Sequence, residues 1–171
     1  MSDAVVVSLQ GAERLNRRLK RYKDAPGSGG PDDPVWQAMG ESALSIQKGA
    51  KENVVSLGAV DTGGGGLLGS IHIRPDLARL QIAVGTEKAH AKYVHDGAGP
   101  AVGHAPFFPP GPALEPWAAR HGMAGAGWAI ARSIFKRGFK PRPFLQYAAD
   151  DEADKYLARM AKALRDFFRR D

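Results

Sequence analysis

Residues 70–86 have the sequence SIHIRPDLARLQIAVGT, in which apolar and polar residues alternate on both sides of a turn. We expect the turn at Pro75 and Asp76. The alternating apolar positions are Ile71 and Ile73 before the turn and Leu80, Ile82 and Val84 after it. A period of two residues around a turn predicts an antiparallel hairpin with one buried face.

Two helices are predicted before this hairpin. The longer one should run from Pro34 to about Asn53, because Asp33 can cap its N-terminus and proline suits the first helical position. The other should run from Ser8 to about Lys23, where apolar residues recur every three or four positions. Both helices have an apolar stripe that could cover the hairpin.

A last helix is predicted near the C-terminus, around an apolar stripe that begins at Ala153. We expect the acidic residues of 150–154 in its first turn and basic residues in its last turn, as the helix dipole favours. The order of helix, helix, hairpin, irregular region and helix predicts an α+β fold. In this fold a small antiparallel sheet is packed by the long helices of the N-terminal half and the C-terminus.

The length of 171 residues fits a single domain over residues 1–171. Two segments are rich in Gly and Pro: residues 24–33 are expected to form a flexible connector, and residues 97–127 an irregular loop insertion. Short helical pieces are expected around 113–121 and 128–136. Aromatic residues in or beside this region could anchor an interface or could pack back onto the core; they are Phe107, Phe108, Trp117 and Trp128.

The composition narrows the classes of partner. The chain has no cysteine, which excludes disulfides, thiolate metal ligands and a catalytic Cys. It shows no signal peptide and no apolar run of about 18 residues, so we expect no membrane contact.

The net charge is +6, and the excess lies in two segments. The first contains Arg14, Arg17, Arg18, Lys20 and Arg21; the second contains Lys136, Arg137, Lys140 and Arg142, with Phe135, Phe139 and Phe144 interleaved. Each segment could be a solvated surface or a DNA-facing one.

Residues 59–71, AVDTGGGGLLGSI, contain the triplet Asp61-Thr62-Gly63, which resembles the signature of aspartic proteases. That chemistry needs two carboxylates sharing a proton, so a protease would have to be a dimer centred on Asp61. The glycines do not form a phosphate-binding loop, because no Lys-Ser/Thr follows them. The competing interpretation is a turn from helix to strand.

The remaining polar residues give little sign of catalysis. The histidines are His72, His90, His95, His104 and His121, and the five-residue spacing of His90 and His95 suits a helical zinc pair poorly. We interpret them as polar surface residues. Ser70 lacks the Gly-x-Ser-x-Gly frame of a nucleophile elbow. We therefore expect no metal and no cofactor.

Five segments, in order, form a pattern: LQGAERLNRRLKR (9–21), ALSIQKGAKENV (43–54), VDTGGGGLLGSIHI (60–73), VGTEKAHAKYVHDGAGP (84–100) and KPRPFLQYAADDEADK (140–155). The pattern resembles the small neck, or tail-completion, proteins of long-tailed double-stranded DNA phages, the family typified by the gene-ten product of a lambda-like phage. Residues 100–130 do not match it, Gly65 and Gly66 lengthen its glycine pair, and residues 95–99 replace its usual Glu-Phe-Gly-Thr-Gly turn. The matching positions are Asp61, Thr62, Gly63, Gly64, Ser70, Gly85, Tyr93, Lys140, Pro141, Arg142, Pro143 and Phe144.

The resemblance implies a structural and not an enzymatic role, in the head–tail junction or at the top of the tail. The implied partners are the connector, tail terminator and tail tube proteins and further copies of the chain in a ring. DNA would pass through the lumen, with cations such as Lys20, Arg21, Lys136 and Arg137 contacting it without sequence specificity. The implied location is the virion neck or tail, assembled in the bacterial host cytoplasm. From the residues alone, the alternative is a basic nucleic-acid-binding accessory protein.

Overall fold

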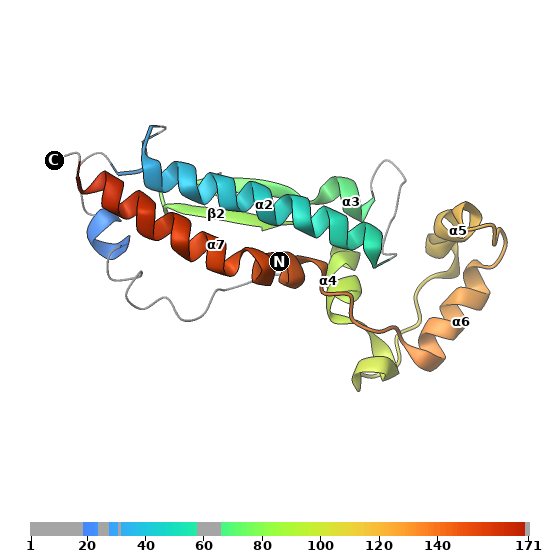
Figure 1. Cartoon of the computed structure of the whole chain (residues 1–171). Helices are drawn as coiled ribbons and strands as arrows, with labels where there is room; N and C mark the ends of the chain where they lie inside the picture. Colours follow the sequence, from blue (N-terminus) through green and yellow to red (C-terminus); the bar gives the residue numbers. More distant parts are fainter. Residues whose placement is uncertain (1–18, 24–27, 31, 58–65, 170–171) are drawn as a thin grey trace.

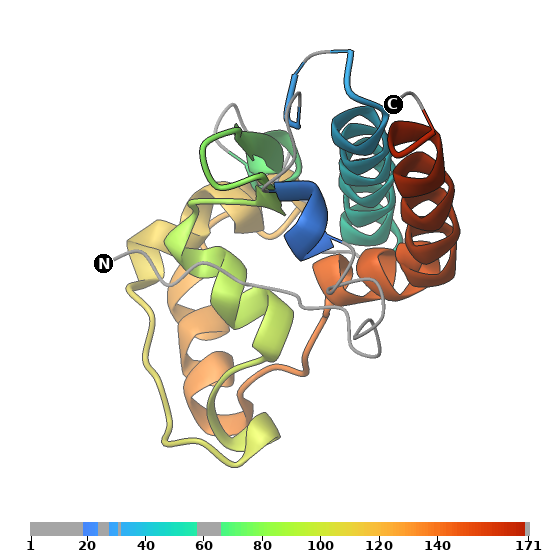
Figure 2. The same ribbon diagram turned by 90° about the vertical axis from the view of Figure 1, so that its left-hand side faces the viewer.

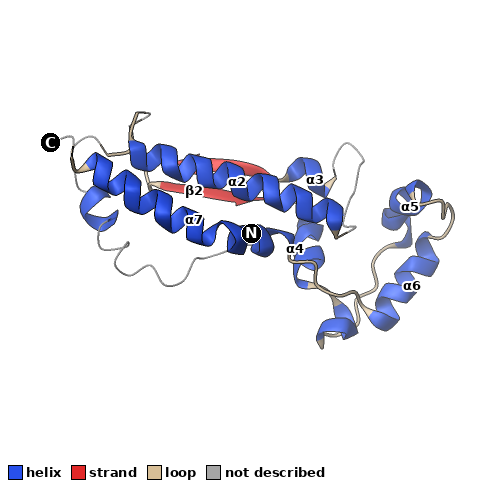
Figure 3. Ribbon diagram, in the orientation of Figure 1, coloured by secondary structure: helices blue, strands red, loops and turns tan. Residues whose placement is uncertain are grey.

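The computed structural model describes residues 19–23, 28–30, 32–57 and 66–169. Within these ranges the chain has the α+β fold that the sequence predicts (Figures 1 and 3). Residues 19–23 are helical. The elements that follow are α2 (Pro34–Ser56), α3 (Leu67–Ser70), β1 (His72–Asp76), β2 (Gln81–Gly85), α4 (Ala89–Asp96), the 3-10 helix η1 (Gly99–Val102), α5 (Gly111–Arg120), α6 (Gly127–Arg137) and α7 (Phe144–Phe167).

Two long helices, α2 and α7, lie antiparallel and side by side, and the β1–β2 hairpin lies against α2 (Figures 1 and 2). Gly49 permits the close approach of the helices, because a Cβ there would lie 3.2 Å from Cβ of Ala148. One apolar core joins the second half of α2 to α3, α4 and the start of α7. A second core, at the other end of the helix pair, contains Tyr22, Val35, Ala38, Met160, Ala163 and Leu164.

The hairpin is antiparallel, with Ile73 opposite Val84. Its turn lies two residues later than predicted: Pro75 and Asp76 are still paired within the ladder, and residues 77–80 form the turn. The strand also begins later, at His72, because Ser70 ends the short helix α3. Alternation alone could not separate the last residues of a helix from the first of a strand.

The N-terminus of α2 matches the prediction. The side chain of Asp33 accepts a 2.8 Å hydrogen bond from the backbone N of Val35, and proline occupies the first turn. The described part of the predicted connector is held in place, since the backbone N of Gly29 donates to the Asp33 carboxylate (2.6 Å) and to the Tyr22 hydroxyl (2.9 Å). The predicted helix over residues 8–23 lies outside the described residues except for 19–23.

The start of α7 corrects the sequence analysis. The helix begins at Phe144, directly after Pro141 and Pro143, so the acidic residues of 150–154 lie beyond its first turn and do not stabilise its N-terminus. The basic last turn is present, with Arg165. The apolar stripe extends further toward the N-terminus than the sequence predicts, because Phe144, Leu145 and Ala148 are buried in the core that they share with α2.

The region 97–127 is more regular than predicted. It contains η1 and α5, and α6 follows it, so the short helical pieces expected near 113–121 and 128–136 are present. The helix α4 was not predicted, because its eight residues contain only a few apolar positions. In the part of the chain that the structure describes, no helix is both long and apolar enough to cross a membrane.

Candidate functional site

A helical arm, formed by residues 99–137, extends from the body at the end away from the C-terminus (Figure 1). Within it, α5 packs on α6 and α6 packs on η1. The Glu115 side chain of α5 accepts hydrogen bonds from the backbone N atoms of Gly125 and Gly127, the latter at 2.9 Å. Gly127 is the first residue of α6. Glu115 therefore satisfies unpaired N–H groups at the N-terminus of α6 and places a negative charge where the dipole favours it.

Glycine permits close contact between the two arm helices. A Cβ on Gly111, the first residue of α5, would overlap the indole ring of Trp128 on α6. The Trp128 side chain is held over this backbone, yet it is 60% exposed to solvent. The arm thus fixes the position of a large apolar group without burying it.

Five exposed aromatic side chains, which we call the aromatic surface, lie on the arm and beside it: Tyr93, Phe107, Phe108, Trp128 and Phe135. Tyr93 of α4 stacks on Phe107 with ring centroids 5.7 Å apart. The next residue, Phe108, lies 6.2 Å from the Trp128 ring and 5.6 Å from the Phe135 ring. The segment between η1 and α5 is therefore in contact with α4 on one side and α6 on the other.

The sequence left open whether Phe107, Phe108 and Trp128 anchor an interface or pack back onto the protein. Phe107 packs on Tyr93, and Phe108 packs on Trp128 and Phe135, yet Phe107, Phe108 and Trp128 each remain between 43% and 60% exposed. Apolar side chains that are exposed and in contact with one another, unlike those scattered singly, are a feature of interaction sites. Trp117 differs, since it stacks on the ring of His121 within its own helix turn, with centroids 4.0 Å apart.

Two cations lie on the same face of α6 as the exposed aromatic residues. Arg132 follows Trp128 by four positions and precedes Lys136 by four, and both cations are exposed. Residues three, four and seven positions apart share a helix face, so Trp128, Arg132, Phe135 and Lys136 form one surface. Arg137 is exposed at the end of the helix.

Lys20 and Arg21, the described cations of the first basic segment, lie at the end of the chain opposite to Lys136 and Arg137 of the second. The helix of residues 19–23 lies near the C-terminal end of α7, where Tyr22 contacts Phe167 with centroids 4.9 Å apart and Arg21 lies 5.8 Å above the Phe168 ring (Figures 1 and 2). Lys20 and Arg21 are exposed there, far from Lys136 and Arg137 on the arm. Arg14, Arg17 and Arg18 lie outside the described residues. A single subunit therefore does not join Lys20 and Arg21 to the cations of the arm in one patch.

The segment from Lys140 to Phe144 connects the arm to the body. Phe139 forms a two-hydrogen-bond bridge with Ala98, and the backbone N of Arg142 donates to the carbonyl of Val94 at 2.9 Å. Lys140, Pro141 and Arg142 are exposed, Pro143 is half-buried, and Phe144 is buried in the core. The prolines set the direction of entry into α7, so this motif has a clear structural use.

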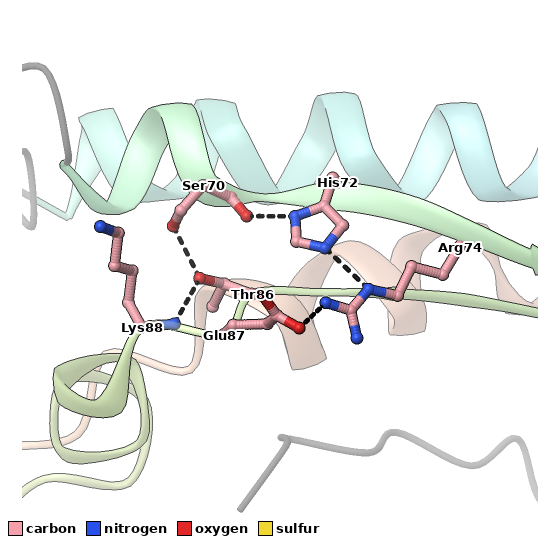
Figure 4. Close-up of polar contacts among 6 residues, drawn as sticks. All are labelled: Ser70, His72, Arg74, Thr86, Glu87 and Lys88. Atoms are coloured by element: carbon pink, nitrogen blue, oxygen red, sulfur yellow. Dashed lines mark hydrogen bonds and ion pairs between the residues drawn. The ribbon is translucent and has the colours of Figure 1, made fainter. Parts of the chain in front are cut away.

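A polar network joins α3 to the open end of the hairpin (Figure 4). The backbone N of Lys88 donates to the Thr86 hydroxyl (3.1 Å), which lies 2.6 Å from the Ser70 hydroxyl. Ser70 donates in turn to the carbonyl of Leu67 at 2.8 Å. Thr86 follows Gly85, the last residue of β2, which pairs with His72. Ser70 and Gly85 therefore belong to the junction between α3 and the sheet.

The histidine of this network does not activate the serine. His72 Nδ1 lies 2.7 Å from the carbonyl of Ser70, and Nε2 accepts a 2.9 Å hydrogen bond from Arg74 Nε. Both ring nitrogens of His72 are therefore engaged, one by the Ser70 carbonyl and the other by Arg74, and neither contacts the Ser70 hydroxyl. Arg74 also pairs with Glu87. With the serine proton directed to a backbone carbonyl, the group lacks the nucleophile and base contact of a hydrolase.

His95 corrects the interpretation of the histidines as surface residues. Its side chain is buried at 8% exposure, with Nδ1 2.7 Å from Asp96 Oδ1 and the ring edge-on to Phe144, whereas no hydrogen-bond partner is present for Nε2. His95 therefore packs at the junction of α4 and α7. Among the described residues, no three His, Cys, Asp or Glu side chains are grouped as a metal site. Asp61, Thr62, Gly63 and Gly64 lie outside those residues.

Comparisons of the chain with protein-family models, with curated protein sequences and with solved structures find no match. The aromatic surface is the feature that the geometry singles out. The sequence indicated three of its residues, Phe107, Phe108 and Trp128, as possible interface anchors. It gave no sign of Glu115 or of the pairing of Tyr93 with Phe107, because both depend on tertiary contacts: Glu115 with the start of α6, and Tyr93 of α4 with the segment between η1 and α5.

Proposed function

We propose that this protein is a structural subunit of a phage or prophage particle, acting at the head–tail junction or the top of the tail without enzymatic activity. The observation that supports the proposal most is the aromatic surface on the arm, because fixed, exposed aromatic side chains are typical interface anchors. The ordered sequence motifs supply the phage context. Neighbouring copies, the connector, the tail terminator and the tail tube are the proposed partners.

The distribution of charge supports a role around DNA that needs several subunits. Exposed cations lie at both ends of the subunit, on the helix of residues 19–23 and on α6. In a ring of subunits, these cations would be repeated around the lumen. There they would contact the phosphates of DNA without sequence specificity. An isolated subunit would bind DNA weakly under this proposal.

The experiment is electron microscopy of particles made without this protein. We expect unjoined heads and tails or aberrant tails, restored when the intact chain is supplied. Normal infectious particles would contradict the proposal.

The alternative, a nucleic-acid-binding accessory protein, is supported by the exposed Phe135 beside Lys136 on the arm. It predicts tight DNA binding by the purified monomer. That affinity should fall steeply with salt and be lost on charge reversal at Arg17, Arg18, Lys140 and Arg142.

A further inference from the structure

A second surface of the chain has the charge opposite to that of the arm. On α7, Tyr147 is followed three and four residues later by Asp150 and Asp151, and Asp154 lies four and three residues after these, so the four side chains share one helix face; all four are exposed. Tyr147 is 48% exposed. We call this group the acidic stripe. The helix dipole does not explain it, because these acids lie beyond the first turn of α7.

The arm offers a surface of matching length. The face formed by Trp128, Arg132, Phe135 and Lys136 spans about 12 Å of α6, and the acidic stripe spans about 10 Å of α7, at a rise of 1.5 Å per residue. One face combines aromatic residues with two cations, and the other combines an aromatic residue with three carboxylates. Opposite charges beside aromatic contacts give both orientation and affinity at an interface.

The two surfaces belong to different parts of the fold. The acidic stripe is on the α2–α7 pair, whereas α6 packs within the arm on α5 and η1 (Figure 2). We propose that the arm face of one copy docks on the acidic stripe of a second copy. Because the two surfaces differ, the contact is heterologous, and repeating it generates a closed ring or an open filament. This inference rests on the proposed function and names the surfaces through which its copies would join.

The absence of cysteine from the chain allows a clean cross-linking test. Ala129, next to Trp128, and Ala158, one turn after Asp154, are both exposed. The full-length variant Ala129→Cys/Ala158→Cys is oxidised at increasing protein concentration. We expect a ladder of disulfide-linked oligomers, with the 129–158 peptide pair identified by mass spectrometry. A mixture of the two single variants should give the mixed dimer in excess over both symmetric dimers.

The matched control is Ala78→Cys/Ala158→Cys, since Ala78 is an exposed alanine in the hairpin turn. Its cross-link yield should be lower by about tenfold or more. Charge reversal on the arm (Arg132→Glu/Lys136→Glu) or on the stripe (Asp151→Lys/Asp154→Lys) should reduce the 129–158 yield by about tenfold, as like charges at an interface repel. Introducing both reversals into one chain should restore it.

The inference is overturned if the ladder is absent, if 129–129 links dominate, if the control links equally well or if the reversals have no effect. A dominant 129–129 link would indicate a symmetric arm-to-arm dimer. The test is independent of the particle experiment: failed cross-linking with unjoined heads and tails removes only this docking arrangement. Successful cross-linking with normal particles removes only the proposed function.

Discussion

Ser45 of α2 donates a 2.8 Å hydrogen bond to the carboxylate of Glu152 on α7, across 107 positions of sequence. Glu152 is only 2% exposed. Its other carboxylate oxygen accepts a 2.5 Å hydrogen bond from Arg159, which also donates to the Ser42 hydroxyl. The buried charge is therefore paired and hydrogen-bonded on both sides, which is the condition for retaining it between two helices.

Replacing Glu152 should destabilise the helix pair strongly. Glu152→Ala removes the closer of the two carboxylates that pair with Arg159, the other being Glu41 at 3.8 Å, and leaves the Ser45 hydroxyl without this acceptor. We therefore expect a loss of about 3 kcal/mol in the free energy of unfolding. Chemical denaturation followed by circular dichroism measures it. Glu52→Ala is the control, because Glu52 lies on α2 and is exposed beside Lys48; it should change stability by less than about 1 kcal/mol. Equal effects of the two would contradict the prediction.

The same carboxylate should make stability depend on pH in the acid range. Burial raises the pKa of Glu152, but the hydrogen bonds from Ser45 and Arg159 and the charge of Arg159 outweigh it and hold the pKa below its ordinary value. A lowered folded-state pKa gives stability that is present above the unfolded value, about 4.3, and lost as pH falls through the folded value. The free energy of unfolding should therefore fall below about pH 4. Glu152→Gln should flatten that part of the profile, and an unchanged slope would rule out this origin.

Asp33 and Tyr22 should contribute to the free energy of unfolding as a coupled pair. Burial first, and then the hydrogen bond to Asp33, raise the pKa of the Tyr22 hydroxyl far above its ordinary value, so it remains a donor. Asp33→Ala removes the cap of α2 and this acceptor, at an expected cost of about 2–4 kcal/mol. In a double-mutant cycle with Tyr22→Phe, the double variant should lose less than the sum of the single variants. Additive losses would show that the two side chains are not coupled.

Glu115→Gln should destabilise the contact between α5 and the start of α6 without destabilising the α2–α7 helix pair. The change removes the negative charge at the N-terminus of α6 and leaves one acceptor oxygen where two backbone N–H groups donate. We expect amide hydrogen exchange of Gly125 and Gly127 to accelerate by about tenfold, while exchange in α2 and α7 is unchanged. Glu87→Gln, outside the arm, is the charge-matched control. Faster exchange throughout the chain would mean that Glu115 supports the whole fold.

Gly111→Ala should displace Trp128. The added methyl group would overlap the indole ring, so the ring or the start of α5 must move. The indole resonance of Trp128 in an NMR spectrum should shift, whereas the resonance of Trp36 in α2 should not. Gly40→Ala is the control, because nothing lies within 4 Å of a Cβ at Gly40; this change inside α2 should stabilise by about 0.5–1 kcal/mol. An unshifted Trp128 resonance would refute the contact.

The sequence by itself determined the α+β class, the capped start of α2 and the existence of the hairpin, because these depend on local periodicity and on turn and cap residues. Tertiary structure decided where α7 begins, since burial of Phe144 and Ala148 against α2 overrides the local pattern. Tertiary structure also decided which polar side chains are buried. His95 and Glu152 look like surface residues in sequence, and only packing shows that they are buried. The aromatic surface and the contacts of Glu115 arise in the same way, from α4, α5, α6 and the segment between η1 and α5, which folding brings into contact.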